Sequence, residues 1–299
     1  MVVPVFWPAV LALMLNALVW GVSWWPFRQL QALGLHPLWT TALVYGLAVG
    51  VILLWRPAAF GQLLRSRALW GIAFAAGVTN AAFNWAVTIG EVVRVVLLFY
   101  LSPLWTVLLA RWLLHERFSG RVALRVLLAL AGATLVLGVG GRTGAAGAPA
   151  GPALLLADLL GLLAGATFAL NNVLLRRESQ RPDEGRALAM FSGGVLVSSA
   201  VALSAGTHAG VPISWPASVQ LTWLLPALLL GLAFLGGNLA LQYGATRLPA
   251  NVTAVVMPTE IVFASVSAVW LGGEQLQPAV LAGGALILAA TVLAARGEG

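Results

Sequence analysis

The feature that most constrains this chain is a series of ten apolar stretches, each long enough to cross a lipid bilayer as a helix. They cover residues 4–27, 37–55, 68–89, 92–114, 121–140, 152–175, 186–206, 219–246, 250–271 and 277–295. About 20 apolar residues are needed to cross the hydrocarbon core. Backbone N–H and C=O groups in lipid must form hydrogen bonds within the protein, which only helices and closed β-barrels achieve. The alternation of apolar and polar residues that is typical of a barrel is absent. We therefore predict an all-α membrane protein with ten transmembrane helices.

Composition excludes most other classes of protein. Only 8% of the residues are charged and 61% are hydrophobic, whereas a soluble domain carries about 25% charged residues. The chain has no cysteine and no lysine, which excludes thiolate metal sites, a phosphate-binding P-loop lysine and a Schiff-base lysine. The formal charge of +7 comes from arginines placed between apolar stretches. We attribute this charge to contact of the arginines with anionic lipid rather than with nucleic acid. We expect no cofactor.

An internal repeat links the two halves of the chain. A shift of 158 positions aligns residues 83–116 with residues 241–274. It places Asn80 on Asn238, Asn84 on Gln242, Trp85 on Tyr243, Thr88 on Thr246, Trp112 on Trp270 and Glu116 on Glu274. A shift of 148 aligns the first stretch of each half, placing Trp20 on Phe168, Ser23 on Asn171 and Trp24 on Asn172. Many secondary transporters are built from such duplications.

The repeat and the arginines together predict the topology. Residues 1–141 form a first five-helix repeat, residues 142–151 a linker rich in Gly, Ala and Pro, and residues 152–299 a second repeat. Thirteen arginines lie on one side of the predicted membrane, and Arg28, Arg94 and Arg142 lie on the other. Because positive loops stay inside, we expect both termini to be cytoplasmic. Five is odd, so the second repeat is inverted relative to the first.

Polar residues recur at helical spacing in both halves. Asn80, Asn84 and Thr88 form one stripe on the third stretch, and Asn238, Gln242 and Thr246 form the equivalent stripe on the eighth. Amides are unfavourable toward lipid, because they leave hydrogen-bonding atoms unpaired. The stripes either form hydrogen bonds to neighbouring helices, each worth about 0.6 kcal/mol, or line a polar cavity. Their occurrence in both halves favours the cavity.

Glu260 lies near the middle of the ninth stretch. A carboxylate at this depth costs about 3 kcal/mol or more, so a functional role is the default interpretation. Three roles stay open, namely a proton carrier, a charge partner for a substrate, and a structural hydrogen bond. No arginine is predicted at the same depth to pair with it. Pro103 and Pro258 should kink the fourth and ninth helices and free backbone carbonyls.

Aromatic residues complete the predicted site. Trp20, Trp85 and Tyr243 lie deep in their stretches, where they could stack on a substrate or simply pack. The candidate substrate-binding residues are Asn16, Trp20, Trp24, Asn80, Asn84, Trp85, Phe168, Asn171, Asn238, Gln242, Tyr243 and Glu260. Other acids have expected roles outside the site. Glu116 and Glu274 precede new helices, where a carboxylate suits the positive N-terminus, and Asp158 and Glu91 are expected to be solvated.

These residues resemble a known family. The layout of five plus five stretches, and the endings Leu-Leu-His-Glu-Arg (113–117) and Leu-Gly-Gly-Glu-Gln (271–275) before a new helix, resemble the drug/metabolite transporter (DMT) superfamily. More narrowly, the chain is similar to EamA-type ten-span exporters, which include amino-acid and metabolite exporters. The resemblance implies a central cavity formed by helices 1, 3, 4, 6, 8 and 9. Glu260 matches the Glu of a Glu-Pro pair in that family, but Ile261 replaces the Pro.

We therefore predict a multi-pass protein of the bacterial inner membrane that exports small organic metabolites by alternating access. Amino acids with apolar, aromatic or otherwise neutral side chains are the expected substrates. The alternative is a proton-coupled efflux carrier for hydrophobic cationic drugs. The expected partners are the substrate, the bilayer and possible coupling protons, in a monomer or weak homodimer. An enzyme is not expected, because His36, His115 and His208 all lie near stretch ends and no HExxH motif occurs.

Overall fold

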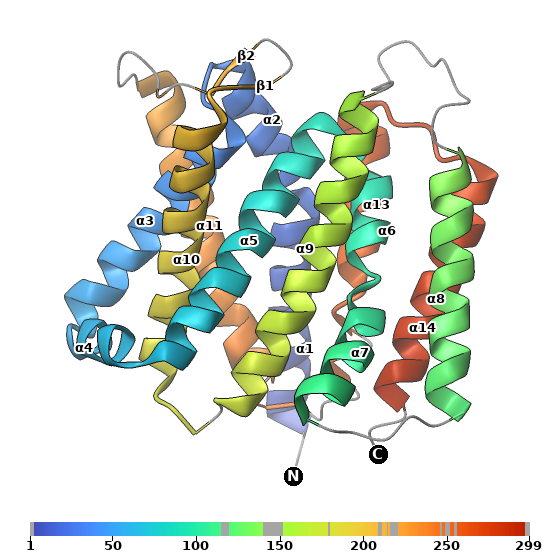
Figure 1. Cartoon of the computed structure of the whole chain (residues 1–299), viewed down its shortest axis with the longest axis horizontal. Helices are drawn as coiled ribbons and strands as arrows, with labels where there is room; N and C mark the ends of the chain where they lie inside the picture. Colours follow the sequence, from blue (N-terminus) through green and yellow to red (C-terminus); the bar gives the residue numbers. More distant parts are fainter. Residues whose placement is uncertain are drawn as a thin grey trace.

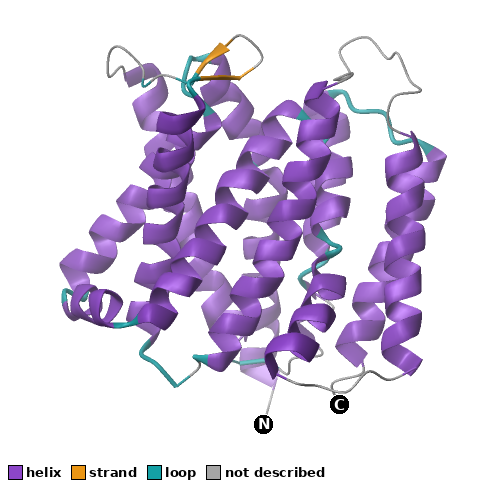
Figure 2. Ribbon diagram, viewed as in Figure 1, coloured by secondary structure: helices purple, strands orange, loops and turns teal. Residues whose placement is uncertain are grey.

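A computed structural model describes residues 3–114, 120–139, 152–178, 180–208, 211–213, 215, 221–245, 247–248, 252–253 and 256–296. These residues are almost entirely helical, as Figure 2 shows. The helices are α1 (Val3–Val22), α2 (Trp24–Ala32), α3 (Pro37–Trp55), α4 (Ala58–Arg65), α5 (Arg67–Ile89), α6 (Val92–Phe99), α7 (Ser102–Leu114), α8 (Gly120–Val139), α9 (Pro152–Arg177), α10 (Asp183–Ala205), α11 (Leu221–Ala245), α13 (Thr259–Gly272) and α14 (Pro278–Arg296). Strands β1 (Thr207–His208) and β2 (Val211–Pro212) pair antiparallel between α10 and α11.

The structure confirms an all-helical membrane protein. In the described part of the chain, six helical segments are long and apolar enough to cross a membrane by length and composition. They are 6–32, 37–55, 67–89, 153–177, 183–205 and 222–245. Shorter apolar helices occupy 92–106, 126–136, 259–272 and 278–290, at the four other predicted stretches. Large apolar side chains such as Trp7, Trp55, Trp112 and Trp270 are exposed, as expected for a surface facing lipid.

Two helical elements were not predicted. The first stretch is interrupted at Ser23 and continues as α2 to Ala32. The short helix α4 follows α3 and buries Ala59 and Leu63 against α5 and α10, while Phe60 and Leu64 stay exposed. With eight residues it is too short to cross a bilayer, so a search for long apolar stretches does not find it. The predicted linker 142–151 lies outside the described residues, and the boundaries of the repeats stay predictions.

Two helices are interrupted, at equivalent positions of the repeat. The fourth stretch breaks between α6 and α7 at Tyr100-Leu101, shortly before Pro103. The ninth breaks at Met257-Pro258, before α13. Proline has no N–H to donate to the preceding turn, which accounts for both interruptions. The predicted kinks are therefore confirmed. The offset of 158 places Tyr100 on Pro258, so the breaks in the two halves lie within one residue of each other.

The two predicted halves interleave rather than pack as separate bodies (Figure 1). The first helix of each half inserts against the other half: α1 packs on α11 and α13, and α9 packs on α5, α6 and α7. Two further pairs, α3 with α10 and α8 with α14, join helices at the same place in each repeat. The set is symmetric. Exchanging the equivalent helices of the two halves, α1 with α9, α5 with α11, and α6 and α7 with α13, gives the same contacts. The start of α1 and the end of α14 lie at the same end of the bundle, the lower end in Figure 1.

Glycines bring some helix pairs into backbone contact. A Cβ placed on Gly193 of α10 would lie 1.8 Å from the carbonyl oxygen of Ala73 on α5. A Cβ on Gly132 of α8 would lie 2.6 Å from the carbonyl oxygen of Gly283 on α14. Only a residue without a side chain permits such approach, which is a common device between membrane helices.

Candidate functional site

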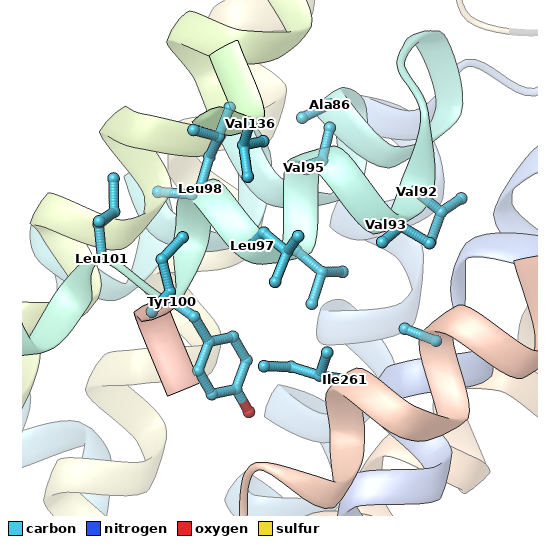
Figure 3. Close-up of a cluster of buried hydrophobic side chains, with 14 of the residues drawn as sticks. Ala86, Val92, Val93, Val95, Leu97, Leu98, Tyr100, Leu101, Val136 and Ile261 are labelled. Carbon is cyan, nitrogen blue, oxygen red and sulfur yellow. The ribbon is translucent and has the colours of Figure 1, made fainter. Parts of the chain in front are cut away.

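Glu260 lies at the beginning of α13 and is only 7% exposed. Its Oε2 accepts a hydrogen bond from the hydroxyl of Tyr100 at 3.0 Å. The same hydroxyl lies 3.3 Å from the carbonyl oxygen of Met257, to which it can also donate. Figure 3 shows Tyr100 reaching from the end of α6 toward Ile261 of α13. The two interrupted helices, one from each half, therefore meet at Glu260.

Tyr100 is the partner of Glu260 that the sequence did not reveal. A second element of the first half also contacts this place, because a Cβ on Gly21 of α1 would lie 2.7 Å from the carbonyl oxygen of Glu260. Among the described residues, no arginine forms an ion pair with Glu260. Residue 260 is thus packed against two elements of the other half, and its buried carboxyl group has a phenol as hydrogen-bond donor.

The predicted residues of α1 and α2 reach across to the second half. The amide nitrogen of Asn16 donates to the carbonyl oxygen of Gly237 at 2.9 Å. The indole nitrogen of Trp24 donates to Ser267 Oγ at 2.9 Å, which links α2 to α13. Asn16 and Trp24 are both buried. Ser267 lies seven residues after Glu260, a spacing that places both on one face of a helix.

Two of the predicted aromatic residues, Phe168 and Trp20, pack against other aromatic rings. Phe168 of α9 packs on Phe99 with ring centroids 5.0 Å apart, and Phe99 packs on Tyr100 at 5.8 Å. Predicted residue Phe168 is therefore connected to Glu260 through two rings. Trp20 of α1 packs on Phe234 of α11 at 4.5 Å, so it lies in a separate cluster toward α3 and α11.

The amide stripe on α5 forms hydrogen bonds to α3. Asn80 Oδ1 accepts from the hydroxyl of Tyr45, and Asn84 Nδ2 donates to Thr41 Oγ1 at 3.0 Å. The ring of Trp85, the next residue, packs on His36, just before α3, with centroids 5.4 Å apart. These contacts are those of the interhelical alternative, in which the amides join neighbouring helices. Asn84 Oδ1 is buried and has no partner among the described residues.

The remaining predicted residues are spread along α9 and α11. Asn171 is buried, and its Oδ1 has no partner among the described residues. Asn238 is half-buried in α11. Tyr243 is exposed, with the guanidinium of Arg247 3.9 Å from its ring centroid. Gln242 lies in α11, but its side chain is outside the described set.

A buried ion pair lies away from Glu260 and corrects one expectation. Asp158 was predicted to be solvated, and this is wrong: it is 6% exposed on α9. Both of its carboxylate oxygens accept from the guanidinium of Arg94, at 2.6 Å each. Arg94 also donates to the carbonyl oxygen of Val136 at 2.6 Å, so it joins α6, α8 and α9. Asp158 lies in the second turn of α9, where Arg94 binds it.

Glu274 caps a helix of the other half. Its carboxylate accepts from the backbone N–H of Val92 at 2.8 Å and of Val93 at 3.3 Å, at the N-terminus of α6. Arg28 of α2 pairs with it at 3.4 Å. The expected interaction with a helix N-terminus is thus present, but with α6 rather than with the helix that follows Glu274. Burial, and next the carboxylate of Glu274, raise the pKa of nearby Glu91; it is half-buried.

Comparison with known proteins supports the predicted family. Residues 7–138 and 155–296 each match the EamA-like transporter family, and together they cover most of the chain. A comparison with curated proteins finds no match. One solved crystal structure is 21% identical to this chain, covers 96% of each chain and has a TM-score of 0.58, which shows a shared fold. The chain therefore belongs to the EamA-like transporter family of the DMT superfamily, whose members are secondary transporters of small molecules and not enzymes.

Proposed function

We propose that this protein exports amino acids with apolar, aromatic or otherwise neutral side chains, and that it does so by alternating access. The transport path runs between two inverted five-helix repeats that cross the membrane ten times in total. Both termini are cytoplasmic, in the inner membrane of a bacterium. The outward direction follows from the resemblance to EamA-type exporters, and the alternation of access from the repeat.

The observation that carries this proposal is a pair of buried amide oxygens. Asn16 Oδ1 on α1 and Asn171 Oδ1 on α9 have no hydrogen-bond partner among the described residues, although buried polar atoms are almost always paired. They lie on the first helix of each half. Asn16 is four residues before Trp20 in the sequence, and Asn171 is three residues after Phe168. An ammonium group supplies the donors that such oxygens need. The aromatic rings supply an apolar surface for a side chain.

The test is transport by the purified protein in liposomes. We expect uptake of labelled phenylalanine and none of labelled tetraphenylphosphonium. Replacing Asn171 or Asn16 with Leu removes an acceptor for the ammonium group and should raise the KM about tenfold, which is the effect of losing one hydrogen bond to a charged group.

Ser198→Ala is the matched control. Ser198 Oγ is also buried without a partner among the described residues, but it lies on α10 outside the proposed site. Its removal should leave the KM for phenylalanine unchanged. Equal effects of Ser198→Ala and Asn171→Leu would show that the orphan oxygens act through folding and not through the substrate.

One observation favours the alternative function, proton-coupled efflux of hydrophobic cations. Glu260 is a buried carboxyl group with no arginine paired to it in the described part of the chain, so it could serve as counter-charge for a cation. Transport of tetraphenylphosphonium without phenylalanine in the same liposomes would favour this alternative over amino-acid export.

A further inference from the structure

The contact between Tyr100 and Glu260 is a hydrogen bond between the two halves at their interrupted helices. Tyr100 ends α6 in the first half, and Glu260 begins α13 in the second. The repeat offset of 158 shows that the interruptions are equivalent by symmetry. In transporters with repeats, interrupted helices of this kind mark sites for substrates and coupling ions. The hydroxyl of Tyr100 lies 3.0 Å from Glu260 Oε2 and 3.3 Å from the carbonyl oxygen of Met257.

The charged groups on the surrounding elements are engaged elsewhere. α13 packs on α1 and α6, and α1 contains no charged residue. The charged residue of α6, Arg94, binds Asp158. Arg28 of α2 binds Glu274 and the carbonyl oxygens of Val87 and Gly90. In the described part of the chain, Tyr100 is thus the titratable group that faces Glu260.

We propose that the Tyr100–Glu260 pair binds the proton that couples transport to a gradient, and that proton binding loosens this link between the halves. The proposal rests on the proposed function in one respect, that the halves move relative to each other during transport. The proton is the coupling ion, and Tyr100 is the residue that holds the carboxyl group of Glu260.

The physical reason is the strength of the hydrogen bond in the two charge states. An ionised Glu260 accepts from Tyr100 in a charge-assisted hydrogen bond, which is about twice as strong as a neutral one. When a proton from water adds to the carboxylate, the acceptor becomes neutral and the bond weakens, while Tyr100 keeps its own proton. The low dielectric of the protein interior enlarges this difference. Protonation therefore favours separation of α6 from α13.

A proton fits this site better than a metal ion. Hard cations require several oxygen ligands. Here one carboxylate faces a hydroxyl that already donates to it, and no group of three His, Cys, Asp or Glu that could hold a metal occurs in the described residues. Sodium ions are therefore a control in the experiment.

The experiment measures the distance between the halves as a function of pH, without substrate. The chain contains no cysteine, so spin labels can be placed on cysteines at Leu108 in α7, the helix that follows α6, and at Leu271 in α13, both exposed. In lipid nanodiscs the distance distribution should change with pH and should not change with sodium at constant pH. Glu260→Gln should abolish the pH response. Tyr100→Phe should shift its midpoint to higher pH by about one unit or more, because the ionised carboxylate loses its donor.

Two matched variants control for other causes. Thr79→Val removes another hydrogen bond between the halves, the 2.9 Å contact with Thr167, without changing a titratable group. Glu91→Gln removes a titratable group away from Glu260. Both should keep the wild-type midpoint. An unchanged midpoint in Tyr100→Phe, an unchanged response in Glu260→Gln, or a response to sodium alone would overturn the proposal.

The outcome is independent of the substrate. If phenylalanine is not transported but the pH response follows Glu260 and Tyr100, the proposed substrate is wrong and the proton site stands. If phenylalanine is transported and the distance ignores pH, the proton site is wrong and the proposed export stands. Should Glu260→Gln fail to fold, Tyr100→Phe, which keeps the carboxylate, decides alone.

Discussion

At the scale of single residues, the buried pair of Arg94 and Asp158 makes the clearest stability prediction. The guanidinium of Arg94 is 3% exposed and Asp158 is its carboxylate partner. Asp158→Asn leaves this charge buried without a counter-charge, and we expect a loss of about 3–5 kcal/mol of unfolding free energy. Asp183→Asn breaks an exposed pair with Arg186 instead and should cost less than about 1 kcal/mol. Equilibrium unfolding in mixed micelles measures both, and equal losses would contradict the argument.

Glu91 gives a prediction about pH. Burial and the nearby Glu274 carboxylate raise its pKa in the folded protein, so ionisation of Glu91 opposes folding. The stability that protonated Glu91 supplies is complete below the unfolded pKa and is lost as pH rises through the folded pKa. Glu91→Gln avoids this loss. Its melting temperature should therefore exceed that of the wild type at neutral pH, and the gap should close as the pH falls to acid values. A gap that is constant with pH would rule out ionisation as its cause.

At the scale of helices, glycines determine which pairs pack closely. In Gly193→Ala the new methyl group would lie 1.8 Å from the backbone oxygen of Ala73, so α5 and α10 must separate. We expect a loss of about 1–3 kcal/mol or more. Gly50→Ala on α3 is the control, because no atom lies within 4 Å of its Cβ position; it should stabilise the helix by up to about 1 kcal/mol. Thermal unfolding of the two variants in one detergent compares them, and equal melting temperatures would contradict close packing at Gly193.

At the scale of the whole molecule, the arginines and the helical path predict the orientation. The start of α1 and the end of α14 lie at one end of the bundle (Figure 1). Since thirteen of sixteen arginines fall on the side predicted to be cytoplasmic, we expect a reporter fused after Gly299 to be active only in the cytoplasm. A second reporter placed within 142–151 should be active only outside. Activity of both on the same side would exclude five crossings in the second half and, with them, the inverted repeat.

The amino-acid sequence determined the helical class, the repeat, the helix interruptions and the family, because each depends on local properties. Apolar length decides whether a segment can cross lipid, proline removes a backbone donor wherever it stands, and a duplication is visible as similarity at a fixed offset. Residues far apart could be paired only by the tertiary structure. It joined Tyr100 to Glu260, Arg94 to Asp158 and Asn84 to Thr41. Helical spacing specifies which side chains share a face, but the rotation and neighbours of each helix, set by packing of the whole bundle, decide what that face meets.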